Sequence, residues 1–242
     1  MVIATPICSV YLNGAPSNPD INYKNQDLDL GDPVIGRNLF SLPWNGCLVA
    51  TRSICKGITG QQLADFGFVE GKAIVIDGRR YLCRCPRIGD EKNGNSEWDN
   101  IVNFYGGVRT SFWNPNDRSW TQKFSSEGRL QFACGGFTAT DRSIVPPGDH
   151  SPTLGFRPIL EPLDPLWVGE SHVGKTIRFF GIGGSVSGVL SQADDYDFVL
   201  DMGPDNTEIM DRDLNALPWV SLTDDWMALV DRRAVVCARP LD

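Results

Sequence analysis

A hairpin signal in residues 72–85 constrains the fold of this chain more than any other feature. The dipeptide Asp77-Gly78 stands between the β-branched run Ala-Ile-Val-Ile and a run that contains Tyr-Leu-Cys. Asp-Gly is favoured in two-residue hairpin turns, whose central residues both adopt positive φ. The pattern therefore predicts two antiparallel strands. The 25 glycines and 16 prolines are spread along the whole chain, which favours further short strands and turns over long helices.

Other predicted elements are short. Thr59 is a suitable N-cap for a helix that begins at residue 60. Ser96 is a suitable N-cap for a second helix, because apolar residues follow it at helical spacing, namely Trp98, Ile101, Val102 and Tyr105. We expect strands at 47–54, 129–134 and 155–160. Residues 1–45 show few periodic apolar positions and are expected to form an irregular N-terminal arm.

A boundary is predicted at Pro162-Leu-Asp-Pro165, since two prolines in four residues disfavour regular structure. Four strand-like runs separated by turns follow it, at 173–180, 184–193, 196–202 and 234–238. Residues 165–242 contain 6 Lys and Arg against 13 Asp and Glu, a net charge of −7, whereas residues 1–164 contain 16 and 17. This acidic balance argues against binding to a nucleic acid duplex, which requires clustered cations.

The composition also bears on the cellular compartment. No apolar run approaches the roughly 18 residues of a membrane span, and the N-terminus lacks the basic region of a signal peptide. The seven cysteines are an odd number and lie in apolar or glycine-rich surroundings, which favours reduced, buried thiols. We therefore expect a protein of the host-cell cytoplasm or of a virion.

The order of residues in the middle of the chain suggests a family. It runs through three tryptophans, an arginine, a Cys-Gly-Gly-Phe segment, a second arginine and a Gly-Phe-Arg-Pro strand, at Trp98, Trp113, Trp120, Arg129, 134–137, Arg142 and 155–158. From about residue 74 to 161 this order resembles the C-type-lectin-like fold, in the branch shared by formylglycine-generating-enzyme-like domains and retroelement variable proteins. The resemblance implies a scaffold that presents irregular loops to a ligand, and an origin in phages or gut bacteria.

Residues 173–237 resemble an Sm-like or SH3-like small barrel, although acidic residues stand where an Sm-like protein has RNA contacts. The two resemblances together imply an α+β fold. We expect an irregular arm over 1–45, a C-type-lectin-like domain over 46–163 and a small acidic β-barrel over 165–242. Any homo-oligomer is expected to assemble through this barrel.

Motifs for catalysis or metal binding are weak. The chain has two histidines, His150 and His172, and neither has a second ligand at zinc spacing. The formylglycine-generating enzymes use a cysteine pair late in the domain, where this chain offers Cys134 alone. The loop 90–97 alternates oxygen-bearing residues as calcium loops do, but it contains Lys92, and a solvated turn explains it better. We expect no cofactor, no bound metal and no enzymatic activity.

The remaining candidate is a polar and aromatic surface between residues 107 and 151. Tryptophan and arginine dominate recognition surfaces because they supply large contact areas and several hydrogen bonds. The predicted ligand-binding residues are Arg109, Trp113, Asn114, Asn116, Asp117, Arg118, Trp120, Arg142 and His150. Trp98 is expected in the core, Trp120 suits either the core or the surface, and Arg157 is expected to be a buried cation paired with a carboxylate.

Three functional hypotheses remain open. The leading one is a non-enzymatic protein that binds a small molecule or a partner protein. One alternative is a phage anti-defence protein that inhibits a host protein or sequesters a nucleotide signal, with phosphates bound by Arg109, Arg118, Arg129 or Arg142. Another is a virion-associated adhesin that binds a receptor. An oxidase of the formylglycine-generating type is the least favoured.

Overall fold

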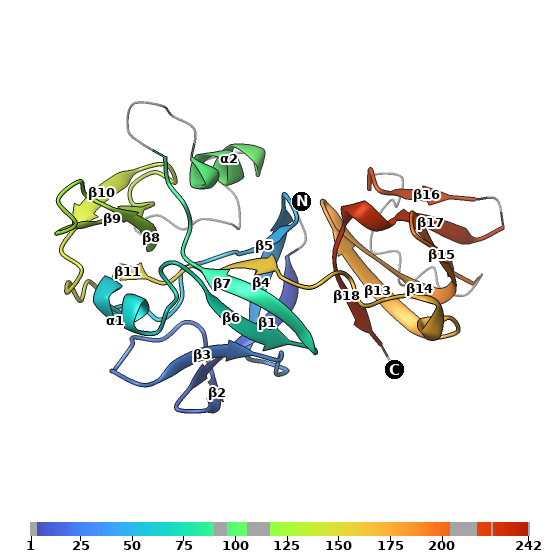
Figure 1. Ribbon diagram of the computed structural model, residues 1–242, viewed down its shortest axis with the longest axis horizontal. Helices are drawn as coiled ribbons and strands as arrows, with labels where there is room; N and C mark the ends of the chain where they lie inside the picture. Colours follow the sequence, from blue (N-terminus) through green and yellow to red (C-terminus); the bar gives the residue numbers. More distant parts are fainter. Residues whose placement is uncertain (1–3, 90–95, 106–116, 204–216, 224, 242) are drawn as a thin grey trace. The chain divides into compact units, whose positions relative to one another are not determined.

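The computed structural model describes residues 4–89, 96–105, 117–203, 217–223 and 225–241 (Figure 1). The chain divides into two compact units. The larger unit consists of Pro6–Ser41 and Val49–Glu161. The C-terminal unit consists of Pro162–Asp242 together with Met1–Thr5 and Leu42–Leu48.

The largest sheet has eight strands, in the spatial order β2-β1-β4-β5-β12-β7-β6, with β3 paired to β1. Its strands are β1 (Thr5–Leu12), β2 (Ala15–Ser17), β3 (Leu28–Gly31), β4 (Asn38–Trp44), β5 (Cys47–Ala50), β6 (Lys72–Ile76), β7 (Arg79–Arg84) and β12 (Ile159–Pro162). The hairpin of β6 and β7 is confirmed, and its turn residues Asp77 and Gly78 have φ of 48° and 75°.

Residues 1–45 are not the irregular arm that we predicted, because β1 to β4 lie within them. The turn between β1 and β2 contains Asn13 and Gly14, with φ of 50° and 76°. Asn45 and Gly46, with φ of 45° and 77°, connect β4 to β5 in the same way. Asn and Gly tolerate the left-handed conformation that such tight hairpin turns require. The Asn, Gly and Pro residues of this region therefore connect strands rather than prevent them.

A second sheet in the larger unit has four strands in the order β10-β9-β8-β11. These are β8 (Arg118–Phe124), β9 (Gln131–Cys134), β10 (Arg142–Val145) and β11 (Leu154–Gly155). The same unit contains the helices α1 (Gly60–Asp65) and α2 (Glu97–Phe104). Both predicted caps are present: Thr59 accepts a hydrogen bond from the Gln62 amide, and Ser96 accepts one from the Asp99 amide.

The C-terminal unit contains a six-stranded antiparallel sheet in the order β16-β17-β15-β14-β13-β18 (Figure 1). Its strands are β13 (Thr176–Gly181), β14 (Gly184–Ala193), β15 (Asp197–Asp201), β16 (Val220–Leu222), β17 (Met227–Asp231) and β18 (Val235–Pro240). Phe179 and Phe198 stack in its core with ring centroids 4.5 Å apart. Strands were predicted at β13, β14, β15 and β18, whereas β16 and β17 were missed.

The α+β fold class that we predicted is wrong. Strands account for 47% of the described residues and helices for 10%, so this part of the protein is mostly β. The two α-helices of the described residues have six and eight residues. The prediction failed because the N-terminal strands and the pair β16 and β17 were not recognised, which removed much of the sheet from the expected fold.

Candidate binding site

The predicted binding residues divide between described and undescribed parts of the chain. Arg109, Trp113, Asn114 and Asn116 lie outside the described residues. The other five belong to the larger unit, on β8, on β10 or in the loops that adjoin these strands. They are Asp117, Arg118, Trp120, Arg142 and His150.

Asp117 lies at the start of β8 and is almost fully buried, at 3% exposure. Its carboxylate lies 3.4 Å from the Arg157 guanidinium and 3.1 Å from the Lys56 ammonium, and it accepts a hydrogen bond from the Ser53 amide. Arg157 is fully buried, and it also donates to the Ala50 carbonyl and the Ser119 hydroxyl. The prediction that Arg157 is a buried cation paired with a carboxylate is confirmed. Asp117 therefore fixes the start of β8 to the interior rather than facing a ligand.

Arg118 and His150 hold one loop against the rest of the larger unit. One terminal nitrogen of Arg118, Nη2, donates to the Ser151 hydroxyl at 2.8 Å and to the Thr153 hydroxyl at 3.1 Å. His150 is exposed, and its Nδ1 lies 3.0 Å from the Gly57 carbonyl oxygen. Both side chains contact neighbouring loop atoms, so they define the shape of this loop.

Trp120 and Arg142 also have internal partners. The Trp120 side chain is fully buried, and its indole nitrogen donates to the Ile58 carbonyl at 2.8 Å. Arg142 on β10 forms an ion pair with Asp99 on α2, and one of its nitrogens lies 3.4 Å from the Ser96 hydroxyl. Trp98, which the sequence placed in the core, is buried and donates to the Ala139 carbonyl. These contacts attach α2 to the four-stranded sheet and to the loop that follows β9.

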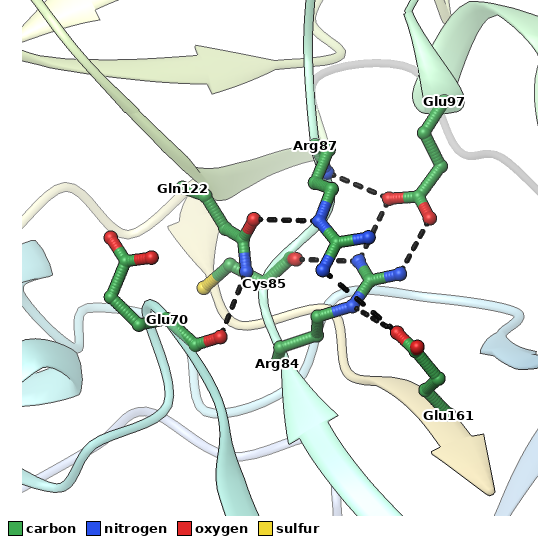
Figure 2. Close-up of polar contacts among 7 residues, drawn as sticks. All are labelled: Glu70, Arg84, Cys85, Arg87, Glu97, Gln122 and Glu161. Carbon is green, nitrogen blue, oxygen red and sulfur yellow. Dashed lines mark hydrogen bonds and ion pairs between the residues drawn. The ribbon is translucent and has the colours of Figure 1, made fainter.

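A cluster of two arginines and two glutamates attaches α2 to the eight-stranded sheet (Figure 2). Arg84 on β7 has a side chain only 1% exposed. It forms a bidentate ion pair with Glu97, with nitrogen–oxygen distances of 2.8 and 2.7 Å. Its Nε lies 3.1 Å from the carboxylate of Glu161 on β12. Bidentate pairing of this kind fixes orientation as well as distance. We call these residues and Arg87 the arginine–glutamate cluster.

The outer edge of the arginine–glutamate cluster is open to solvent. The side chains of Arg87 and Glu161 are 53% and 40% exposed, and their charged groups lie 3.9 Å apart. The Arg87 Nε donates to the Gln122 side chain, which in turn donates to the Glu70 carbonyl (Figure 2). Glu97 accepts from the Arg87 backbone amide in addition to Arg84. The Glu97 carboxylate thus has partners within the protein for both of its oxygens. The side chains of Arg87 and Glu161 also have internal contacts, but they face solvent as well.

Four of the cysteines are poor nucleophiles. All seven are free and buried. Burial raises the pKa of Cys55 and of Cys134 to about 12, and it also raises the pKa of Cys83 and of Cys85. Since the thiolate is the reactive form, these thiols stay protonated near neutral pH.

Metal-binding and membrane-spanning segments can be assessed only for the described residues. The loop 90–97 considered for calcium lies outside the described residues, except for Ser96 and Glu97. Within the part of the chain that the structure describes, no group of three or more His, Cys, Asp and Glu residues could hold a metal ion. No helix of these residues is long and apolar enough to cross a membrane.

No family model, curated protein or solved structure matches this chain. The resemblances stated for residues 74–161 and 173–237 therefore stay predictions.

Sequence reasoning missed the arginine–glutamate cluster, although one signal was available. Arg84 lies between Cys83 and Cys85 at the end of β7, where both neighbours are buried. An arginine at such a position is almost never fully buried unless it is paired. A buried partner for Arg84 could thus have been inferred, but Glu97 and Glu161 could not have been identified from their spacing.

Proposed function

We propose that this chain is a binding protein in which residues 106–116, which lie between α2 and β8 in the sequence, contact the ligand or partner. This segment contains Arg109, Trp113, Asn114 and Asn116. The observation that carries the proposal is that ion pairs with buried or largely buried side chains, at most 18% exposed, hold the structure on both sides of the segment. On the α2 side these are Glu97 with Arg84 and Asp99 with Arg142, and on the β8 side Asp117 with Arg157.

These ion pairs are better suited to fixing the positions of α2 and β8 than to stabilising the fold. A buried pair usually adds little stability compared with apolar side chains of similar volume, because both charges lose their hydration. Such pairs do fix geometry, since their directional hydrogen bonds allow one arrangement. Binding is tighter when a recognition loop emerges from a preorganised scaffold, because less conformational entropy is lost on association. The placement of three such pairs next to residues 106–116 therefore supports a recognition role for this segment.

The contacts of Arg118 and Arg142 favour a partner protein, or a small molecule other than a nucleotide, as the bound species. Two of the four arginines that the nucleotide hypothesis offers as phosphate contacts, Arg118 and Arg142, have internal hydrogen-bond partners. Of the other two, Arg129 is exposed and Arg109 lies outside the described residues. Catalysis by cysteine is disfavoured by the raised thiol pKa values. Binding without turnover is the function that these contacts support best.

The test compares the wild-type protein with the double variant Arg109→Ala/Trp113→Ala by native mass spectrometry after incubation with a bacterial cell extract. We expect the wild type to retain an added mass that the double variant lacks, with both proteins unfolding at the same temperature. Phe40→Ala is the matched control, because Phe40 is an exposed aromatic residue on β4. Equal retention by the double variant and the wild type would contradict the proposal, as would chemical conversion of the bound molecule.

A further inference from the structure

The outer face of β15 and β17 in the C-terminal unit has an apolar centre between two acidic ends. Val199 on β15 lies directly opposite Leu229 on β17, and Leu229 is 39% exposed. On one side of this pair Asp197 lies opposite Asp231, and on the other Asp201 lies opposite Met227. These side chains point outward because the residues that alternate with them are fully buried, namely Phe198, Leu200, Ala228 and Val230.

An exposed aromatic residue immediately precedes each of the two strands, outside the alternating positions that form the face. Tyr196 immediately precedes β15 and is 72% exposed, and Trp226 immediately precedes β17 and is 49% exposed. Because the two strands are antiparallel, Tyr196 lies at the end with Asp197 and Trp226 at the end with Asp201. Trp226 has a φ of 61°, a conformation that is unusual for a bulky residue.

The charges on this face are only partly compensated within the chain: Asp231 pairs with Arg233 and accepts a hydrogen bond from the Arg233 amide. Like charges directly opposite each other, such as Asp197 and Asp231, destabilise a pair of strands. Arg233 lies 3.3 Å from Asp231, but its side chain is 82% exposed, so water weakens this ion pair. Residues 165–242 carry 6 Lys and Arg and 13 Asp and Glu, so a partner with positive charge would relieve the repulsion.

We propose that this face, composed of Asp197, Val199, Asp201, Met227, Leu229 and Asp231, binds an extended lysine- or arginine-containing segment of another protein. Cations of that segment pair with the carboxylates of the face. Its apolar side chains cover Val199 and Leu229. Charge complementarity identifies the partner, because a second copy would bring the same negative charge and a nucleic acid would bring phosphates.

The experiment uses the full chain and two fluorescein-labelled peptides, one of alternating lysine and valine and one of alternating glutamate and valine. Fluorescence anisotropy is expected to show saturable binding of the lysine peptide, weakened by added salt, and no binding of the glutamate peptide. Leu229→Ser and Asp197→Lys are each expected to weaken the binding about tenfold or more. The matched controls Val75→Ser and Asp65→Lys change exposed residues of the larger unit and should bind as the wild type does.

Thermal unfolding of every variant shows whether the substitution disturbs the fold. Equal binding of both peptides would overturn the proposal, as would wild-type affinity in correctly folded Leu229→Ser. A dimer of the chain that Leu229→Ser dissociates would also overturn it, because a second copy would then occupy the face. This test involves neither Arg109 nor Trp113, so its failure would leave the function proposed for residues 106–116 standing.

Discussion

Replacing Asp117 with asparagine removes the carboxylate that lies 3.4 Å from the Arg157 guanidinium. Arg157 is fully buried, so its positive charge would remain in the interior without this counter-charge. Removing one partner of a buried ion pair costs about 3–5 kcal/mol. The hydrogen bonds of Arg157 to Ala50 and Ser119 stay in place, which favours the lower end of this range. We expect Asp117→Asn to lower the free energy of unfolding of the larger unit by about 3 kcal/mol.

The reverse substitution, Arg157→Met, should cost less. Asp117 would keep the Lys56 ammonium at 3.1 Å and the hydrogen bond from the Ser53 amide. The loss is then mainly that of hydrogen bonds and packing, about 1–3 kcal/mol. In the double variant the buried cation is absent, so the asparagine leaves unpaired only Lys56, whose side chain is 30% exposed to water. The double variant should therefore be about as stable as Arg157→Met alone, and clearly more stable than the sum of the two single effects implies.

Urea unfolding followed by tryptophan fluorescence measures these differences, because Trp98 and Trp120 are both buried in the larger unit. The chain has two compact units, so the transition of the larger unit is identified by its response to Trp120→Phe. A loss below about 1 kcal/mol for Asp117→Asn would place the pair in the range of exposed ion pairs and refute the reasoning. Strictly additive effects in the double variant would refute it as well.

Three further predictions concern single features. Burial raises the pKa of Cys55 and of Cys134 from 9.0 to about 12, so above pH 9 these thiols lose their protons in the unfolded chain before they do so in the folded one. The free energy of unfolding should therefore fall by up to about 1.4 kcal/mol per pH unit for each thiol. A urea midpoint that stays constant between pH 9 and pH 11 would contradict this. Gly155→Ala would place a methyl group 2.5 Å from the Ile54 carbonyl oxygen, which should cost about 1–3 kcal/mol and lower the melting temperature measured by scanning calorimetry. Ser96→Ala removes the N-cap of α2 and should cost about 1 kcal/mol in the same assay, whereas Ser96→Asp should retain most of the stability.

The local elements of this fold could be predicted from the sequence because short-range chemistry determines them. The Asp77-Gly78 turn, the Thr59 cap and the Ser96 cap each depend on residues within four positions of one another. The burial of Trp98 follows from apolar residues at helical spacing along α2. These features need no knowledge of the remaining chain.

The N-terminal strands could have been predicted by the same reasoning. Asn13-Gly14 and Asn45-Gly46 are hairpin signals as strong as Asp77-Gly78, and both pairs have positive φ in the structure. They were overlooked because the many polar residues around them suggested an irregular arm. Recognition of these two turns would have assigned β1, β2, β4 and β5 and indicated a mostly β fold.

The roles of the predicted binding residues could not be predicted, because their partners are distant in the sequence. Asp117 pairs with Arg157 across 40 residues, Arg142 contacts Asp99 across 43, and Arg84 contacts Glu161 across 77. A polar and aromatic stretch has the same composition whether its side chains face a ligand or fix a loop to the core. The distinction depends on strand order, since β7 and β12 must be neighbours before Arg84 can contact Glu161. A charged residue in a loop-rich region therefore predicts a binding surface only after its internal partners have been excluded, and Arg118 and Arg142 do not meet this condition.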